Sequence, residues 1–167
     1  AEATNAEQVA LALDWGNSGW PDFSIYAPVF TAAFEAKLPL RGAGLTRDDL
    51  APLFKGGEVD PELRREYGLD EALAESERAA WLDELFDAHC GAMPREALGP
   101  MLLAQRLRDA AMADALRQGA RGILIAGSGH VRRDRAVPAL LRRSGREGLS
   151  VAFIEVDPER RELSQYA

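Results

Sequence analysis

Several residue types are scarce in this sequence, and each scarcity excludes a class of protein. The chain of 167 residues has one cysteine, Cys90, so no intrachain disulfide can form. Its two histidines, His89 and His130, are too few for a histidine-rich metal site. Because Lys37 and Lys55 are the only lysines, the 20 basic residues include 18 arginines. The formal net charge of −7 excludes a general nucleic-acid binder, which would carry a basic surface.

Long hydrophobic runs are also missing. No stretch approaches the about 18–20 consecutive apolar residues of a transmembrane helix, so we expect no membrane-spanning segment. The charged and apolar regions of a signal peptide are not found, nor is a CxxC, HExxH or Walker A pattern. Hydrophobic residues nevertheless make up 47% of the sequence, and a chain of this length can bury a core. We therefore expect one globular domain, with or without a small lid.

Helical patterns cover most of the sequence. Capping residues such as Asn5 and Thr46, together with apolar positions at helical spacing, mark where these helices begin and end. A further short helix is expected to start at Asp60-Pro61, because proline favours the first helical position. The longer predicted helices cover residues 5–15, 22–36, 46–54, 70–89, 99–118 and 137–143.

Three short apolar segments, residues 38–43, 123–126 and 150–156, predict strands. A continuous apolar run such as the second is typical of a parallel strand buried on both faces. The alternation with helices predicts an α/β fold, a mostly parallel sheet flanked by helices. We expect its core to comprise residues 1–44 and 95–167, and the polar helical residues 45–94 to form an insert that acts as a lid or dimer arm.

The most distinctive local pattern is Gly127-Ser128-Gly129-His130, directly after the second apolar run. Open α/β sheets bind ligands at the carboxyl ends of their strands, and glycines let the backbone turn sharply beside a ligand. His130 would then act as a base, a metal ligand or a hydrogen-bond donor. A tight turn whose histidine caps the next helix is the alternative, and the four residues alone favour neither.

Polar side chains near this turn extend the candidate site. Arg132 and Arg133 follow it, and arginines beside a glycine-rich turn can bind carboxylates or phosphates with paired hydrogen bonds. On the longest predicted helix, Gln105, Arg108 and Asp109 recur at helical spacing beside a face of small residues. The alternatives are a solvated helix start for the arginines and an ordinary surface pair between arginine and aspartate.

Two further positions are candidates within the polar helical segment. Tyr67 has no evident role in a core there, and a tyrosine phenolate can ligate ferric haem. His89 precedes Cys90 at a predicted helix end, and a neighbouring histidine can activate a thiolate. A buried helix end is the simpler interpretation of that pair.

Four stretches of the sequence match one known family in order and spacing. They are Gly19-Trp20 through Tyr26-Ala27-Pro28, Leu38-Pro39-Leu40 with Ala43-Gly44-Leu45-Thr46-Arg47, His89-Cys90 through Met93-Pro94 with Met101, Ala104-Gln105, Arg108-Asp109-Ala110 and Met112-Ala113, and residues 123–134 with Ala136-Val137-Pro138. With these stretches the sequence resembles the ChaN-type family of haem-binding lipoproteins over almost its whole length.

This resemblance implies both a fold and a function. It implies an α/β domain with a parallel sheet and a smaller helical subdomain. The protein would serve bacterial iron or haem acquisition, anchored at the periplasmic side of a membrane by a lipid on an N-terminal cysteine. Haem would lie at a homodimer interface, ligated by a tyrosine with help from a partner histidine, and haem-uptake machinery would be a further partner. The family is also related to proposed metal-dependent hydrolases with a Gly-x-x-His motif, which Gly127 to His130 match.

Part of the family pattern is not found in these residues. The amino-terminal strand ending in a Gly-Glu-x-His motif, the signal peptide and the lipid-attachment motif have no counterpart here. We therefore expect the chain to begin part-way through a larger domain. Any metal site that needs both histidine motifs is expected to be incomplete in these residues.

Three hypotheses follow. The first is a haem-binding protein, in which Tyr67 ligates the iron as the metal-binding residue. Its other cofactor-binding residues would be His89, His130, Arg132, Arg133, Gln105 and Arg108. The alternative is a hydrolase in which His130 and Asp109 activate water directly or through a metal. The third is an interaction module whose glycine-rich turn is only structural.

Overall fold

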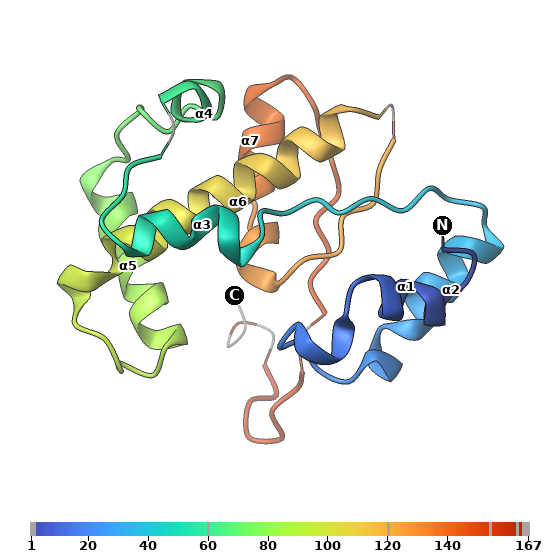
Figure 1. Ribbon diagram of the computed structural model, residues 1–167. Helices are drawn as coiled ribbons and strands as arrows, with labels where there is room; N and C mark the ends of the chain where they lie inside the picture. Colours follow the sequence, from blue (N-terminus) through green and yellow to red (C-terminus); the bar gives the residue numbers. More distant parts are fainter. Residues whose placement is uncertain (1–2, 60, 120, 154, 163, 165–167) are drawn as a thin grey trace. The chain divides into compact units, whose positions relative to one another are not determined.

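The computed structural model describes residues 3–59, 61–119, 121–153, 155–162 and 164. The chain divides into two compact units, Ala1–Gly42 and Ala43–Ala167. Helices are the regular structure of the described residues, and no strand is assigned among them (Figure 1). No helix in the part of the chain that the structure describes is long and apolar enough to cross a membrane.

The first unit contains two α-helices that pack against each other, α1 (Ala6–Ala12) and α2 (Ala27–Glu35). Asn5 caps α1, because its side chain accepts a hydrogen bond from the backbone N–H of Gln8. Between the helices, Trp15 makes ring contacts with four aromatic side chains, at centroid distances of 5.1 to 6.2 Å. Offset and edge-to-face ring contacts stabilise such small cores beyond simple area burial.

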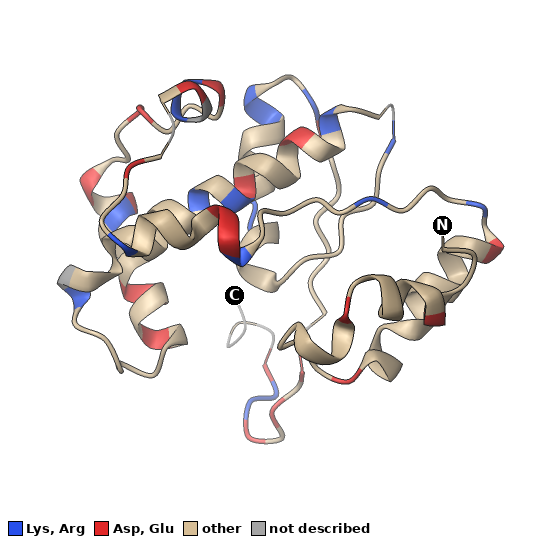
Figure 2. Ribbon diagram, viewed as in Figure 1, with Lys and Arg blue, Asp and Glu red and all other residues tan. Residues whose placement is uncertain are grey.

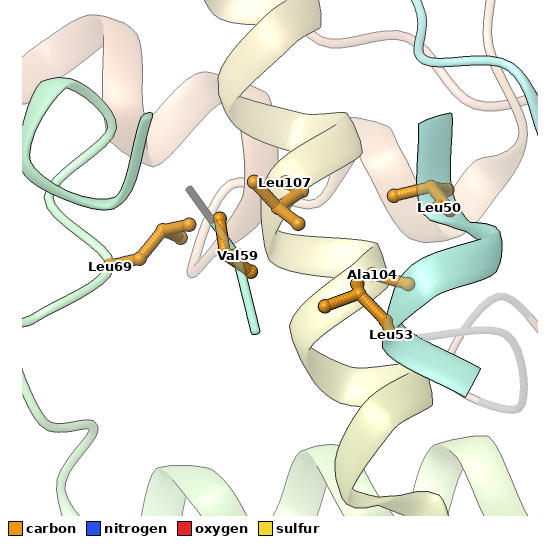
Figure 3. Packing of buried hydrophobic residues seen from close by; sticks show 6 residues of the cluster. All are labelled: Leu50, Leu53, Val59, Leu69, Ala104 and Leu107. Carbon is orange, nitrogen blue, oxygen red and sulfur yellow. The ribbon is translucent and has the colours of Figure 1, made fainter. Parts of the chain in front are cut away.

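The second unit is organised around α6 (Gly99–Arg117), the yellow helix of Figure 1. It packs against α3 (Arg47–Phe54), α5 (Glu75–Ala88) and α7 (Ala136–Arg143). The short helix α4 (Pro61–Glu66) lies between α3 and α5 in the sequence, and the 3-10 helix η4 (Ser128–Val131) precedes α7. Six buried apolar residues form one core cluster: Leu50, Leu53, Val59, Leu69, Ala104 and Leu107 (Figure 3).

Local sequence signals explain where these helices begin. Thr46 and Asp49 form a reciprocal capping box at the start of α3, in which each side chain hydrogen-bonds the other residue's backbone N–H. Small residues on α6, such as Ala104 at 1% exposure, let the leucines of α3 approach its backbone closely (Figure 3). The predicted helix start at Pro61 is confirmed, whereas its expected cap, residue 60, lies outside the described residues.

The predicted α/β fold with a mostly parallel sheet is wrong. None of the described residues in the segments 38–43, 123–126 and 150–156 is assigned to a strand, and residue 154 lies outside the description. The described apolar residues of these segments are not buried: Ile123 is 83% exposed, Ile125 63% and Phe153 96%. A parallel sheet buries both faces under helices, and that burial is not found here.

The physical reason is that a strand needs a lateral partner for its backbone N–H and C=O groups. An apolar run favours extended backbone locally, but it does not supply the neighbouring strand. The segment 38–42 belongs to the first unit, whereas 123–126 and 150–156 belong to the second. The expected division into a core of residues 1–44 and 95–167 with an insert at 45–94 stays a prediction.

Candidate functional site

The side chain of His130 is joined to that of Asp109 by a hydrogen bond of 2.6 Å between Nδ1 and Oδ1. His130 lies in η4, in the turn after the apolar run, and Asp109 projects from the middle of α6. A carboxylate only accepts hydrogen bonds, so Nδ1–H of His130 donates and its Nε2 carries the lone pair. This arrangement fixes both the tautomer and the ring orientation, as it does in bases and metal ligands.

Burial sets the electrostatics of the pair. Asp109 is 1% exposed, and its second oxygen, Oδ2, has no hydrogen-bond partner among the described residues. Desolvation raises the pKa of Asp109 above its ordinary value, and the hydrogen bond and charge of His130 oppose that rise. Asp109 therefore depends on His130 to remain charged inside the protein.

Gln105 completes this cluster. Its Nε2 lies 3.2 Å from Nδ1 and 3.5 Å from Nε2 of His130. A Cβ atom added at Gly129 would stand 3.6 Å from that same amide nitrogen, an ordinary van der Waals contact. The glycine-rich turn thus lies directly on α6, and Asp109, His130 and Gln105 are the predicted site residues that the structure brings together.

The arginines after the turn do not join that cluster. Arg132 makes paired hydrogen bonds of 3.1 and 2.9 Å with Asp134, and this contact raises the pKa of Arg132. Arg133 is exposed. Arg135 is 7% exposed and forms an ion pair with Glu84. Its guanidinium carbon lies 5.3 Å from the ring centre of Trp81, so Arg135 ties this loop to α5.

Tyr67 lies directly after α4 and packs against the core cluster. It lines a cavity of about 220 Å³ together with its near neighbours Glu66, Gly68 and Glu71 and with residues from α6 and α7. Ala110, Ala113 and Leu140 are apolar wall residues, and Arg117 and Arg143 bring guanidinium groups to the same cavity. Burial raises the pKa of Tyr67 above its ordinary value of 10.0; Glu66 adds to the rise and Arg117 opposes it.

His89 and Cys90 are both exposed at the end of α5, so the interpretation of a buried helix end is wrong. Nδ1 of His89 lies 2.7 Å from the carbonyl oxygen of Leu85. When Nδ1–H donates to that oxygen, Nε2 faces away with a free lone pair. A backbone carbonyl commonly orients histidines that ligate metals in this way.

Arg108 points to a different place from its neighbours Gln105 and Asp109. It lines a second cavity, of about 380 Å³, together with residues of α3. This cavity is lined at a spacing of four residues by Arg47 and Ala51 of α3 and by Lys55 directly after the helix, beside Leu50 and Phe54. The residues of this cavity that come from α3 and its end were not predicted as site residues, although their spacing of four can be read from the sequence.

The predicted haem residues are therefore distributed over several places. Tyr67 follows α4, His89 follows α5 and His130 lies in η4, and no hydrogen bond joins any two of them in the described residues. Within the same described ranges, no group of three or more histidine, cysteine, aspartate or glutamate side chains could hold a metal ion.

The sequence was also compared with known proteins. A family described as "Haem-binding uptake, Tiki superfamily, ChaN" matches residues 1–141, more than four fifths of the chain. No curated protein and no solved structure matches the chain. The match spans the first unit, Tyr67 and the glycine-rich turn, and it confirms the resemblance found in the sequence. The chain therefore belongs to the ChaN family of haem-binding uptake proteins.

Proposed function

We propose that this chain binds haem at the cavity of Tyr67, with the phenolate oxygen of Tyr67 as the iron ligand and a second copy of the chain covering the exposed face. The family to which the chain belongs is one of haem-binding uptake. The observation that carries the assignment is the cavity itself, which combines one phenol with apolar residues and two guanidinium groups, beside the carboxylates of Glu66 and Glu71.

The chemistry of these residues fits haem. A tyrosine is an established axial ligand of ferric haem, the apolar residues Ala110, Ala113 and Leu140 suit the macrocycle, and Arg117 and Arg143 suit its propionates. Arg117 also pairs with Asp114 at 3.1 Å and Arg143 with Glu71 at 3.8 Å. The pair of Arg143 and Glu71 is exposed and that of Arg117 and Asp114 is half-buried, so exchanging a carboxylate of the protein for a propionate has a small energetic cost at Arg143.

The size of the cavity supports a second copy of the chain. At about 220 Å³ it is smaller than the roughly 300–1,000 Å³ clefts that enclose small molecules, so it can accept only part of a macrocycle. The remaining apolar surface of the haem would have to be covered by another surface. His89, which is exposed and has an oriented ring, is our candidate for the histidine that the second copy contributes.

Haem binding at Tyr67 should also release a proton. Because burial raises its pKa above 10.0, Tyr67 is protonated at neutral pH before iron binds. Ligation by the phenolate then releases one proton, since a metal ion stabilises the deprotonated ligand. The enthalpy of hemin binding should therefore depend on the ionisation enthalpy of the buffer.

A hemin titration tests the proposal. The unsubstituted chain should give a saturable Soret shift and a phenolate-to-iron charge-transfer band, and sedimentation should show dimer formation at saturation. Tyr67→Phe should lose the charge-transfer band and the buffer-dependent enthalpy. Tyr26→Phe, in the other unit, is the matched control and should keep both. An unchanged spectrum in Tyr67→Phe would refute the ligand assignment.

We also propose a cellular role, based on the family to which the chain belongs. A chain that binds haem reversibly would serve bacterial iron or haem acquisition at the periplasmic side of a membrane, anchored by a lipid and passing haem to uptake machinery. Transfer of haem from the loaded chain to apo-myoglobin would support a delivery role. Retention of haem under the same conditions would contradict delivery.

The pair formed by Asp109 and His130 favours a second candidate function, hydrolysis with His130 as the base. Asp109 orients the ring so that Nε2 carries the lone pair, which is the arrangement a general base needs. A survey of ester and phosphoester substrates would test this activity. His130→Gln should abolish any hydrolysis found, while Tyr67→Phe should leave it unchanged.

A further inference from the structure

We propose that the cavity between α3 and α6 is a separate binding site for a small amphiphilic anion, a carboxylate on an apolar chain such as a medium-chain fatty acid. The cavity holds about 380 Å³, within the range of clefts that bind small molecules. It shares no lining residue with the Tyr67 cavity, so this inference goes beyond the proposed haem site.

The floor of the cavity is apolar. Leu50 is 1% exposed and belongs to the core cluster, so it closes the cavity toward the protein interior (Figure 3). Ala51 lies beside it, and Phe54 at the end of α3 remains 54% exposed. Covering the ring of Phe54 with a ligand's apolar chain would remove apolar surface from water, at roughly 25 cal/mol per Å².

The rim of the cavity is cationic. Arg47, Lys55 and Arg108 line it, and none of the three forms an ion pair or a side-chain hydrogen bond among the described residues. Figure 2 shows acidic and basic residues interspersed along the helices of this unit, so acidic partners occur on the same elements. Three uncompensated cations around one apolar cavity, in a chain of net charge −7, fit an anion.

Two polar groups of α3 near the cavity are already engaged. Asp49 accepts hydrogen bonds at 2.7 Å from both the backbone N–H and the hydroxyl of Thr46, which ties its carboxylate to the start of the helix. At the other end, the carbonyl oxygen of Pro52 accepts from the backbone N–H groups of Lys55 and Gly57. These contacts reduce the competition that carboxylate and carbonyl oxygens would offer to an anionic ligand.

The three cations lie on two sides of the cavity. Arg47 and Lys55 stand at opposite ends of α3, whereas Arg108 projects from α6. A compact carboxylate can accept paired hydrogen bonds from the planar guanidinium of Arg108. The ligand's apolar chain would then lie along Leu50, Ala51 and Phe54.

Titration calorimetry with decanoate, below its micelle-forming concentration, tests this inference. Decanoate should bind saturably with one site per chain. Decanol and decyltrimethylammonium, which keep the apolar chain but lack the negative charge, should bind at least about tenfold more weakly, because a charge-assisted hydrogen bond contributes about 1.5–3 kcal/mol. Affinity for decanoate should fall as salt is added, because the cations are accessible to solvent.

Variants separate this site from the rest of the surface. Arg108→Gln should weaken decanoate binding about 10- to 100-fold, and Lys55→Gln should weaken it less. Arg78→Gln is the matched control, because Arg78 is also exposed but lines neither cavity. It should leave the affinity unchanged, as should Tyr67→Phe. Circular dichroism at 222 nm confirms that each variant is folded.

Several outcomes would overturn the inference. Equal affinities for decanoate and decanol would show that the cations play no part. Equal losses in Arg108→Gln and Arg78→Gln would show a general charge effect. Loss of decanoate binding in Tyr67→Phe would place the ligand in the other cavity, and absence of saturation would exclude a site altogether.

Discussion

Removing His130 should expose how strongly the protein interior acts on Asp109. In the variant His130→Ala, the carboxylate of Asp109, which is 1% exposed in the unsubstituted chain, loses its one hydrogen-bond partner among the described residues. A buried charge without a partner is highly unfavourable, so Asp109 should take up a proton instead. The double variant Asp109→Asn/His130→Ala removes the charge as well, and it should be the more stable of the two.

The magnitude follows from the pKa of aspartate. Protonating a carboxyl group costs about 1.4 kcal/mol for each pH unit above its ordinary pKa of 3.8. The double variant should therefore exceed His130→Ala in unfolding free energy by up to about 4 kcal/mol at pH 7, and by up to about 1.6 kcal/mol at pH 5. Both variants lack the imidazole, so lost packing and the titration of His130 cancel in this difference.

In the unsubstituted chain, the contribution of Asp109 to stability should also fall as the pH rises. Burial raises the folded-state pKa of Asp109, so the folded state binds this proton more tightly than the unfolded state. The stabilisation from Asp109 is fully present below its ordinary pKa of 3.8 and is lost as the pH rises through the raised value. His130→Ala removes both contributions that lower this pKa. The pH range over which Asp109 stabilises the folded state should therefore extend to higher pH.

Urea unfolding followed by circular dichroism at 222 nm measures these free energies at each pH. His89→Ala is the matched histidine control, because His89 is exposed and should change stability by less than about 0.5 kcal/mol. A difference between the two variants that stays constant from pH 5 to pH 7 would refute the reasoning. It would mean that water or another group compensates the carboxylate.

Three further substitutions have expected effects on the same unfolding measurement. Thr46→Ala should lower stability by about 1 kcal/mol, because it removes the capping box of α3; Thr46→Ser, which keeps the hydroxyl, should recover most of the loss. Leu107→Ala should cost about 2–5 kcal/mol, since Leu107 is 3% exposed and faces the core cluster; a loss below 1 kcal/mol would contradict the packing shown in Figure 3. Glu84→Gln should destabilise by about 1–3 kcal/mol because it leaves the buried Arg135 with only the more distant carboxylate of Asp134, at 4.0 Å, and no loss would show that the pair with Glu84 is dispensable.

The candidate site could be predicted in part. The spacing of Gln105 and Asp109 on a helix, with a histidine in a glycine-rich turn, was enough to group these residues, because helical periodicity fixes which side chains share a face. Arg108 was grouped with them and lies elsewhere, at the α3 cavity. One turn of helix covers a full circle, so residues 105 and 109 can face one neighbour while residue 108 faces another.

Residues close together in the sequence determine where these helices begin, whereas a sheet depends on segments that are far apart in the chain. Asn5, Thr46 and Pro61 mark helix starts through contacts within a few residues, so the sequence alone predicted them. The strands expected at residues 123–126 and 150–156 depended on backbone partners far away in the chain, which apolar composition cannot specify. Only the tertiary structure decided whether those partners exist, which arginine is buried beside Glu84, and which carboxylate is buried against His130.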